Sequence, residues 1–235
     1  MKTITSEILN PAAVSTTRRP RIVSFSGIDG AGKSTQIAAL YHSLERAGMR
    51  VQLLTFWDDV ACLGGTREFS SHALFKGDKG NGSPEKPVHR RDKNIKTWYL
   101  TIARFLIYFL DALSLRRVVT QAQKSDADVV IFDRYIYDEL ANLSLKNPLT
   151  RAYARLLLTL APQPDVAYLL DADPVAARER KPEYPIEFLH ANRAAYLALP
   201  DLARRITVIE PMPQREVERR VTDSMCNADP RSTSR

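Results

Sequence analysis

The sequence predicts an α/β fold in three layers, with a five-stranded parallel sheet flanked by helices on both faces. Five short apolar runs are separated by segments that include helical spacing. These runs are nearly continuous rather than alternating, which is typical of parallel strands buried on both faces. The chain has 235 residues, of which 44% are hydrophobic, so it is long enough to bury a sizeable core as one domain.

The expected strands are short and end at turn residues or charges. Apolar runs of this kind between such breaks are typical of strands. They occupy residues 21–25, 51–56, 128–132, 165–170 and 205–209. In a parallel sheet the carboxyl ends of the strands meet at one edge, where ligands gather.

Two segments between the strands have clear helical spacing. Residues 33–47 place apolar side chains at intervals of three and four, and Gly48 follows as the expected C-terminal cap. Residues 93–124 form the longest helical pattern, either as one helix or as a kinked pair. This pattern predicts a core face, or at its exposed end a pocket lining, made of Trp98, Ile102, Phe105, Phe109 and Leu113.

The expected domain spans residues 21–228. Residues 1–20 are polar and irregular and predict a flexible arm, and residues 229–235 predict a frayed terminus. Residues 76–93 contain three Gly, two Pro and six basic against three acidic residues. They predict a flexible insertion, either a solvated loop or a substrate lid.

Composition limits the class of protein. The net charge of +7 suits polyanionic partners such as nucleotides or nucleic acid without choosing between them. Cys62 and Cys226 cannot build a disulfide framework, and no Cys/His spacing suggests zinc. No run approaches the ~18 apolar residues of a membrane span, and the first twenty residues hold no apolar signal segment. We therefore expect a cytoplasmic protein without a membrane partner.

A glycine-rich segment follows the first expected strand. Residues 27–35, GIDGAGKST, match the pattern G-x-x-x-x-G-K-[ST] between a strand and a helix. The glycines let successive N–H groups converge, and the helix adds the positive end of its dipole. Lys33 supplies a charge for the β- and γ-phosphates, and Ser34 a hydroxyl ligand for Mg²⁺. The expected ATP contacts are Gly27, Ile28, Asp29, Gly30, Ala31, Gly32, Lys33, Ser34 and Thr35.

This P-loop predicts binding of a nucleoside triphosphate but does not separate a kinase from a switch or a motor. A GTPase should carry N-K-x-D after a strand, and the nearest string, residues 123–126 (QKSD), lacks the Asn and precedes a strand. The LSGGQ-like signature of ABC-type ATPases does not occur in the sequence. These absences favour phosphoryl transfer to a small acceptor.

A second motif, Asp133-Arg134-Tyr135, directly follows the third expected strand. Asp133 is therefore placed to act on Mg²⁺, directly or through water. Arg134 is placed to hold a phosphate with two hydrogen bonds. The alternative is an Asp–Arg surface pair that ends the strand.

Four features together resemble the thymidylate kinase family of P-loop nucleoside monophosphate kinases. Two are the loop FSGIDGAGKST, with the acidic Asp29 inside it, and the D-R-Y triplet. Residues 171–180 (DADPVAARER) are similar to the family's L-D-x-x-P-x-x-x-x-x-R entry to the lid. Residues 188–197 (FLHANRAAYL) are similar to its F-x-x-x-x-R-x-x-Y helix after the lid. The features extend over about residues 20–210, and their order and spacing give the resemblance its weight.

The resemblance implies a P-loop NTPase fold with a lid at about residues 178–188. It also implies ATP, Mg²⁺ and transfer of the γ-phosphoryl group to a nucleoside monophosphate, with dTMP as the leading acceptor. Asp29 would face the acceptor sugar and help to order Mg²⁺. Relatives that lack an Arg in the P-loop supply one from the lid, and because Gly30 stands at that place here, Arg180, and after it Arg178, is expected to do so. A homodimer is implied as well, and a stable nucleic-acid partner is not.

The acceptor side departs from the family pattern. The family has R-x-P-G-G-T after the second strand, whereas here residues 56–59 (FWDD) follow it and residues 64–67 (GGTR) come later without the Pro. The family reads thymine with an Arg at a position that corresponds to residues 111–113, which hold no Arg. The expected acceptor contacts are Trp57, Arg67, Arg104, Phe109 and Tyr135, of which Trp57 and Phe109 would otherwise be core residues.

Three hypotheses therefore remain. The leading one is a nucleoside monophosphate kinase of thymidylate kinase type. The second is a P-loop kinase for another small acceptor, such as a deoxynucleoside or a phosphorylated metabolite. The third is an ATP-binding regulatory protein without transfer activity.

Overall fold

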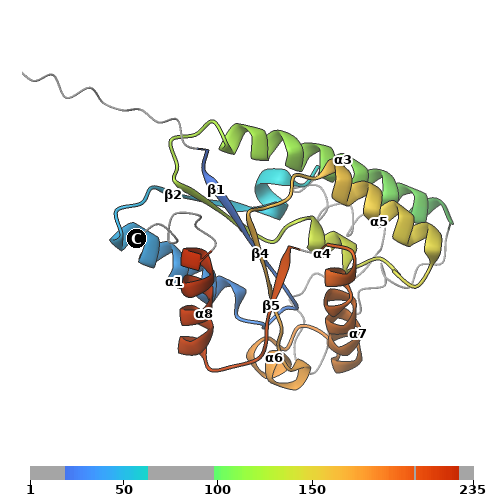
Figure 1. Cartoon of the computed structure of the whole chain (residues 1–235). Helices are drawn as coiled ribbons and strands as arrows, with labels where there is room; N and C mark the ends of the chain where they lie inside the picture. Colours follow the sequence, from blue (N-terminus) through green and yellow to red (C-terminus); the bar gives the residue numbers. More distant parts are fainter. Residues whose placement is uncertain (1–18, 63–97, 204, 228–235) are drawn as a thin grey trace, which may run out of the picture.

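The computed structural model describes residues 19–62, 98–203 and 205–227 (Figure 1). In this part of the chain all strands form one parallel sheet with the order β2-β3-β1-β4-β5. The strands are β1 (Arg21–Ser26), β2 (Val51–Thr55), β3 (Val129–Asp133), β4 (Val166–Leu170) and β5 (Ile206–Ile209). The predicted five-stranded parallel sheet is confirmed, with strand ends that differ from expectation by a residue or so.

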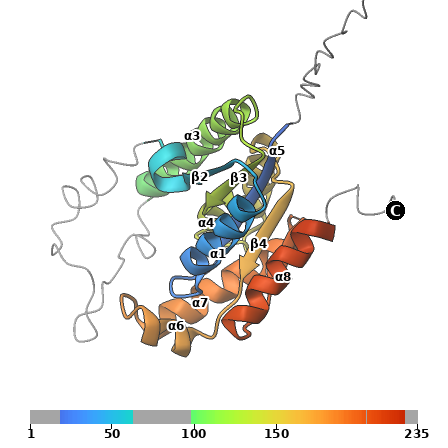
Figure 2. The ribbon, with the colours of Figure 1, turned by 90° about the vertical axis from the view of Figure 1, so that its left-hand side faces the viewer.

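Helices cover both faces of the sheet, so the predicted three layers are also confirmed (Figures 1 and 2). One face carries α1 (Lys33–Arg46) and α8 (Gln214–Asn227). The other carries α3 (Trp98–Ala122), α4 (Ile136–Leu140) and α5 (Pro148–Leu160). The remaining helical elements are η1 (Phe56–Val60), α6 (Pro174–Arg180), α7 (Ile186–Leu197) and η3 (Leu199–Asp201).

The core has two halves, one on each face of the sheet. Along β1, Ile22 points into the half beneath α3 and α5, and Val23 and Phe25 point into the half beneath α1 and α8. Because successive side chains of a strand alternate between faces, a strand covered on both sides must be apolar almost throughout. Each large side chain buried in this way contributes roughly 1.5–3 kcal/mol through the hydrophobic effect.

The central strand β1 determines where a ligand site can form. It pairs with β3 on one side, with Phe25 opposite Asp133, and with β4 on the other, with Ser26 opposite Leu169. Strands β3 and β4 therefore lie on opposite sides of β1. Their connections diverge at the carboxyl end of β1 and create a crevice there. The loop after β1 and the segments after β3 and β4 meet at this edge.

Two local features bear on the sequence-based expectations. The second strand ends at Thr55 and not at residue 56, because Phe56 begins the short π-helix η1. The Asp59 carboxylate in η1 accepts a hydrogen bond from the Thr55 N–H at 2.6 Å. Gly48 adopts φ +77° just after α1 and its N–H bonds to the Glu45 carbonyl, as expected for a C-terminal cap.

The apolar stripe predicted along the long helix is confirmed in part, because Phe105 and Phe109 pack against the core. From Trp98 to Ala122 the chain forms one helix, α3, but Ile102 is 50% exposed. Its buried face carries Tyr108, Ala112, Leu115 and Val119 instead. Almost every residue from 102 to 110 is apolar, so helical spacing alone fits more than one stripe there.

Several expectations fall outside the described residues. These are the arm up to residue 18, the insertion at residues 76–93, Arg67 and the terminus at residues 229–235. Within the described ranges, no helix is both long and apolar enough to cross a bilayer.

Candidate functional site

The glycines of the P-loop hold conformations that other residues rarely adopt. Gly27, Gly30 and Gly32 have φ angles of +143°, +83° and +85°. A Cβ on Gly27 would collide with the carbonyl oxygen of Leu170, and one on Gly30 with the carbonyl oxygen of Ala177 in α6. The loop is therefore packed directly against the end of β4 and against α6, which only glycine permits.

Lys33 is the first residue of α1 and folds back over the P-loop. Its Nζ donates hydrogen bonds to the carbonyls of Gly27 at 2.8 Å and Ile28 at 2.9 Å, and the residue is 7% exposed. Burial, reinforced by the nearby Arg134, lowers the pKa of Lys33 to about 8. The next two residues of the motif, Ser34 and Thr35, are exposed in the first turn of α1.

Arg134 links the end of β3 to the P-loop. It is a non-glycine residue with φ +70°, and its N–H donates to the Phe25 carbonyl at 2.9 Å. Its Nη2 donates to Asp29 Oδ1 at 2.5 Å, and its Nη1 to Asp138 Oδ1 at 3.2 Å. Left-handed backbone outside glycine is sparsely populated and persists where the surroundings hold it in place, often at functional sites.

Asp29 and Arg134 stabilise each other's charged forms. Burial alone would raise the pKa of Asp29, but Arg134 and other nearby cations lower it below its usual range. Burial disfavours the charged form of Arg134, yet Asp138 and Asp29 raise its pKa above the usual value. Asp133 behaves differently, because burial raises its pKa despite the neighbouring Arg134. In the described ranges Asp133 makes no ion pair, so its carboxylate remains available.

Helix α6 leads into the predicted lid at about residues 178–188. Asp173 caps this helix by accepting a hydrogen bond from the Ala176 N–H at 3.0 Å, and Pro174 occupies its first turn. Arg180 ends the helix, and its Nη1 lies 4.0 Å from the point where a Cβ on Gly32 would stand. Within the described part of the chain, neither Arg180 nor Arg178 forms an ion pair.

Helix α7 ties the segment after the lid to the sheet. Arg193 forms a two-pronged pair with Asp171, with Nε and Nη2 each 2.6 Å from a carboxylate oxygen. One turn further on, the Tyr196 hydroxyl donates to Asp138 Oδ1 at 2.8 Å. Both side chains belong to the motif at residues 188–197, and their spacing of three places them on one face of the helix.

Sequence reasoning missed Asp138, Ser26 and Tyr196 as members of this network. Asp138 stands three residues after Tyr135, and an acidic residue at that spacing is typical of a capping box at a helix start. That pattern identifies its local role at α4. The contacts of Asp138 with Arg134 and Tyr196 join three separate elements, and no spacing indicates them.

Among the described residues, the predicted acceptor contacts lie in or against the core and on α3. Tyr135 does not reach the site, because its side chain is fully buried in the core and its hydroxyl donates to the Pro162 carbonyl at 2.6 Å. Trp57 and Phe109 are partly buried against the same half of the core, and Arg104 is partly exposed on α3. Asp111 is fully buried on α3, and its Oδ1 accepts a hydrogen bond from the Cys62 N–H at 2.6 Å.

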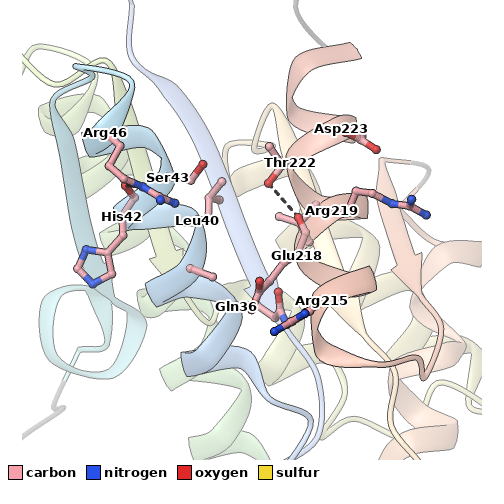
Figure 3. Close-up of a pocket in the computed structure, with 12 residues that line it drawn as sticks. Gln36, Leu40, His42, Ser43, Arg46, Arg215, Glu218, Arg219, Thr222 and Asp223 are labelled. Carbon is pink, nitrogen blue, oxygen red and sulfur yellow. Dashed lines mark hydrogen bonds between the residues drawn. The ribbon is translucent and has the colours of Figure 1, made fainter.

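A surface groove of about 390 Å³ lies elsewhere, between α1 and α8 (Figure 3). Its walls include Gln36, Leu40, Arg46, Arg215 and Thr222. None of the residues predicted for ATP, metal or acceptor lines it, so the phosphate site is a separate place on the molecule. Among the described residues there is also no cluster of three His, Cys, Asp or Glu side chains that could hold a metal ion by themselves.

No family model matches the chain. By sequence it is 26% identical to a probable thymidylate kinase of Archaeoglobus fulgidus over 88% of this chain and 96% of that protein. It is 29% identical to the thymidylate kinase of Tropheryma whipplei over 80% and 86%, and 27% identical to a probable thymidylate kinase of Sulfurisphaera tokodaii over 81% and 86%.

Among solved structures, the chain is similar to a thymidylate kinase from Candida albicans, described as revealing the origin of that enzyme's broad substrate specificity and a novel structural element. The TM-score is 0.60 at 17% identity, over 89% of this chain and 92% of the other. At that identity the likeness shows the fold. Relatives by sequence that match 75–88% of the chain support its similarity to the thymidylate kinase family of nucleoside monophosphate kinases.

Proposed function

We propose that this protein transfers the γ-phosphoryl group of ATP to dTMP. The observation that carries the proposal is the junction of Arg134 with Asp29 beside Lys33, which gathers two cations at the P-loop. Phosphoryl transfer depends mainly on positioning and on stabilising negative charge, and this junction supplies both. The acceptor follows from the relatives, whose names identify them as known or probable thymidylate kinases.

The P-loop would hold the triphosphate. The N–H groups of residues 27–35 and the start of α1 form the cradle, and Lys33 would move from its two carbonyl partners to the β- and γ-phosphates. Arg134 would grip the transferred phosphoryl group from the side of β3. Asp29, held as an anion by Arg134, would face the acceptor sugar.

The donor atoms at this edge fit Mg²⁺. This ion prefers oxygen ligands and keeps several waters while binding one or two carboxylates and the substrate phosphates. Here the exposed Ser34 hydroxyl and the Asp133 carboxylate would hold it, with Asp29 ordering its waters. A divalent cation would also stabilise the anionic form of Asp133, which burial disfavours. When bound, Mg²⁺ neutralises charge on the β- and γ-phosphate oxygens.

The lid would deliver further positive charge when it closes. Arg180 already stands near Gly32, so a small movement of α6 would bring its guanidinium to the phosphates. Arg178, which lies two residues earlier on α6, is the second candidate. Closure that excludes water strengthens such electrostatic contacts.

On the acceptor side, we propose that Trp57, Arg104 and Phe109 contribute to the pocket, together with Arg67. The buried Asp111 stands where the family's thymine-reading Arg is expected. Recognition of the base must therefore differ from the family pattern, which keeps another small acceptor as the second hypothesis.

A coupled ADP-release assay tests the function. The purified chain with Mg·ATP would be given dTMP, dUMP, dCMP, dGMP, AMP or thymidine in turn, with Lys33→Ala as the inactive control. The expected result is the largest stimulation by dTMP. Stimulation only by another compound would replace dTMP as the acceptor, and ATP binding without turnover for any of them would favour a regulatory role.

The rate should also depend on the charge of Lys33. Because burial lowers its pKa to about 8, Lys33 is protonated below pH 8 and loses its charge as the pH rises through that value. We expect kcat/KM for ATP at pH 9 to be about one tenth of its value at pH 7, since each pH unit above the pKa reduces the protonated fraction about tenfold. Lys33→Arg keeps its charge throughout, so its profile should be flat between pH 7 and 9.5. A flat wild-type profile would contradict the assignment.

A further inference from the structure

A single buried carboxylate stands behind the reacting edge of the site. Asp138 is 2% exposed and accepts four hydrogen bonds. Its Oδ2 accepts from Ser26 Oγ at 2.6 Å and from the Tyr135 N–H at 3.0 Å. Its Oδ1 accepts from Tyr196 at 2.8 Å and from Arg134 Nη1 at 3.2 Å. Both oxygens are therefore saturated, as a buried carboxylate requires.

The local role of Asp138 accounts for only half of these contacts. The bonds of Oδ2 cap the start of α4 and attach it to the end of β1. A capping residue needs nothing more, and at many helix starts the second oxygen faces water. Here Oδ1 is turned inward to Arg134 and Tyr196, so it performs a different task.

That task concerns the orientation of the guanidinium group. Arg134 presents two separate Nη groups, one to Asp29 on the P-loop and one to Asp138 on α4. A planar guanidinium held at both Nη groups cannot rotate freely about its Nε–Cζ bond. With the strained φ of +70° at the same residue, the side chain is directed at the loop and held there before any substrate binds.

Tyr196 extends the network to the segment after the lid. It lies on α7, which is anchored a second time through Arg193 and Asp171. The chain passes from the lid helix α6 directly into α7 (Figure 1). A movement of the lid that pulls on α7 therefore acts on the same oxygen that orients Arg134.

We propose that Asp138 is the positioning residue of Arg134 and that, through Tyr196, it couples the orientation of Arg134 to the lid-following helix α7. This rests on the proposed function insofar as Arg134 acts on the transferred phosphoryl group. Asp138 does not touch the substrates, and it acts through the guanidinium alone.

The test begins with Asp138→Asn, which keeps the size of the side chain and removes its charge. Its amide can still accept from Tyr135 and Ser26, but it turns an NH₂ group toward Arg134. We expect kcat to fall about 10- to 100-fold, as small misplacements of a catalytic group do. The Kd of Mg·ATP by calorimetry at pH 6.5, where Lys33 is protonated, should change less than about threefold, because none of the four hydrogen bonds of the Asp138 carboxylate goes to Lys33 or to the P-loop backbone. Tyr196→Phe is the matched control, which removes one donor from the same oxygen and leaves the arginine contact, so its kcat should fall less.

A double-mutant cycle separates positioning from a structural role. If Asp138 acts through Arg134, adding Asp138→Asn to Arg134→Lys should lower kcat less than about threefold further, so the two effects are far from additive. Additive effects would overturn the proposal and leave Asp138 as a helix cap.

A spectroscopic readout makes the test independent of turnover. In the free enzyme, NMR of the Arg134 guanidinium, assigned by loss of its signals in Arg134→Lys, should show two distinct Nη groups that merge in Asp138→Asn. If that variant does not fold, Tyr196→Phe should still shift the Nη1 signal, and an unchanged spectrum would overturn the coupling. Wild-type turnover of dTMP decides the proposed function separately, because the spectrum requires no acceptor.

Discussion

Lys33→Ala is expected to lower kcat for phosphoryl transfer at least about 100-fold. In the proposed mechanism the ammonium group carries the mobile charge of the P-loop, and stabilisation of the developing charge on the phosphates is the main catalytic contribution to phosphoryl transfer. Its loss also frees the carbonyls of Gly27 and Ile28 and leaves α1 otherwise intact. Steady-state kinetics with saturating Mg·ATP measure the effect.

The control for this variant is Lys146→Ala, which removes an exposed lysine between α4 and α5 and should leave kcat unchanged. A circular dichroism melt shows whether both variants are folded. A folded Lys33→Ala protein with nearly normal turnover would refute the kinase mechanism as a whole.

Arg180→Ala is expected to lower kcat by about 100-fold or more while changing the KM for ATP much less. An arginine that reaches the transferred group only when the lid closes contributes mainly in the transition state, and arginines of this kind contribute several orders of magnitude to the rate. Arg180 is exposed, and among the described residues its Nε bonds only to the Ala176 carbonyl of its own helix, so its removal should barely affect stability.

The matched control is Arg151→Ala, which removes an exposed arginine on α5. Arg178→Ala, measured beside it, ranks the two lid candidates. If Arg180→Ala raises KM and leaves kcat unchanged, Arg180 contributes to ground-state binding and the charge at the transition state must come from Arg134 or Arg178.

The amino-acid sequence was sufficient for the scaffold and for the phosphate loop. Strands buried on both faces must be apolar along their whole length, so each of the five was visible as a local run. The loop after β1 was visible for the same reason, because its glycines are required by backbone angles and close contacts that no other residue tolerates. These constraints act within a few residues, and a short pattern is enough to express them.

Where side chains meet across distant segments, only the tertiary structure decided the outcome. Tyr135 follows the site in the sequence, yet its ring turns into the core, while Asp138 three residues later becomes the centre of the site's network. Tyr196 reaches that carboxylate from 58 residues away. The direction of a side chain at the end of a strand depends on the packing of the whole layer behind it. That packing is a sum of many weak long-range contacts, and no local spacing in the chain records it.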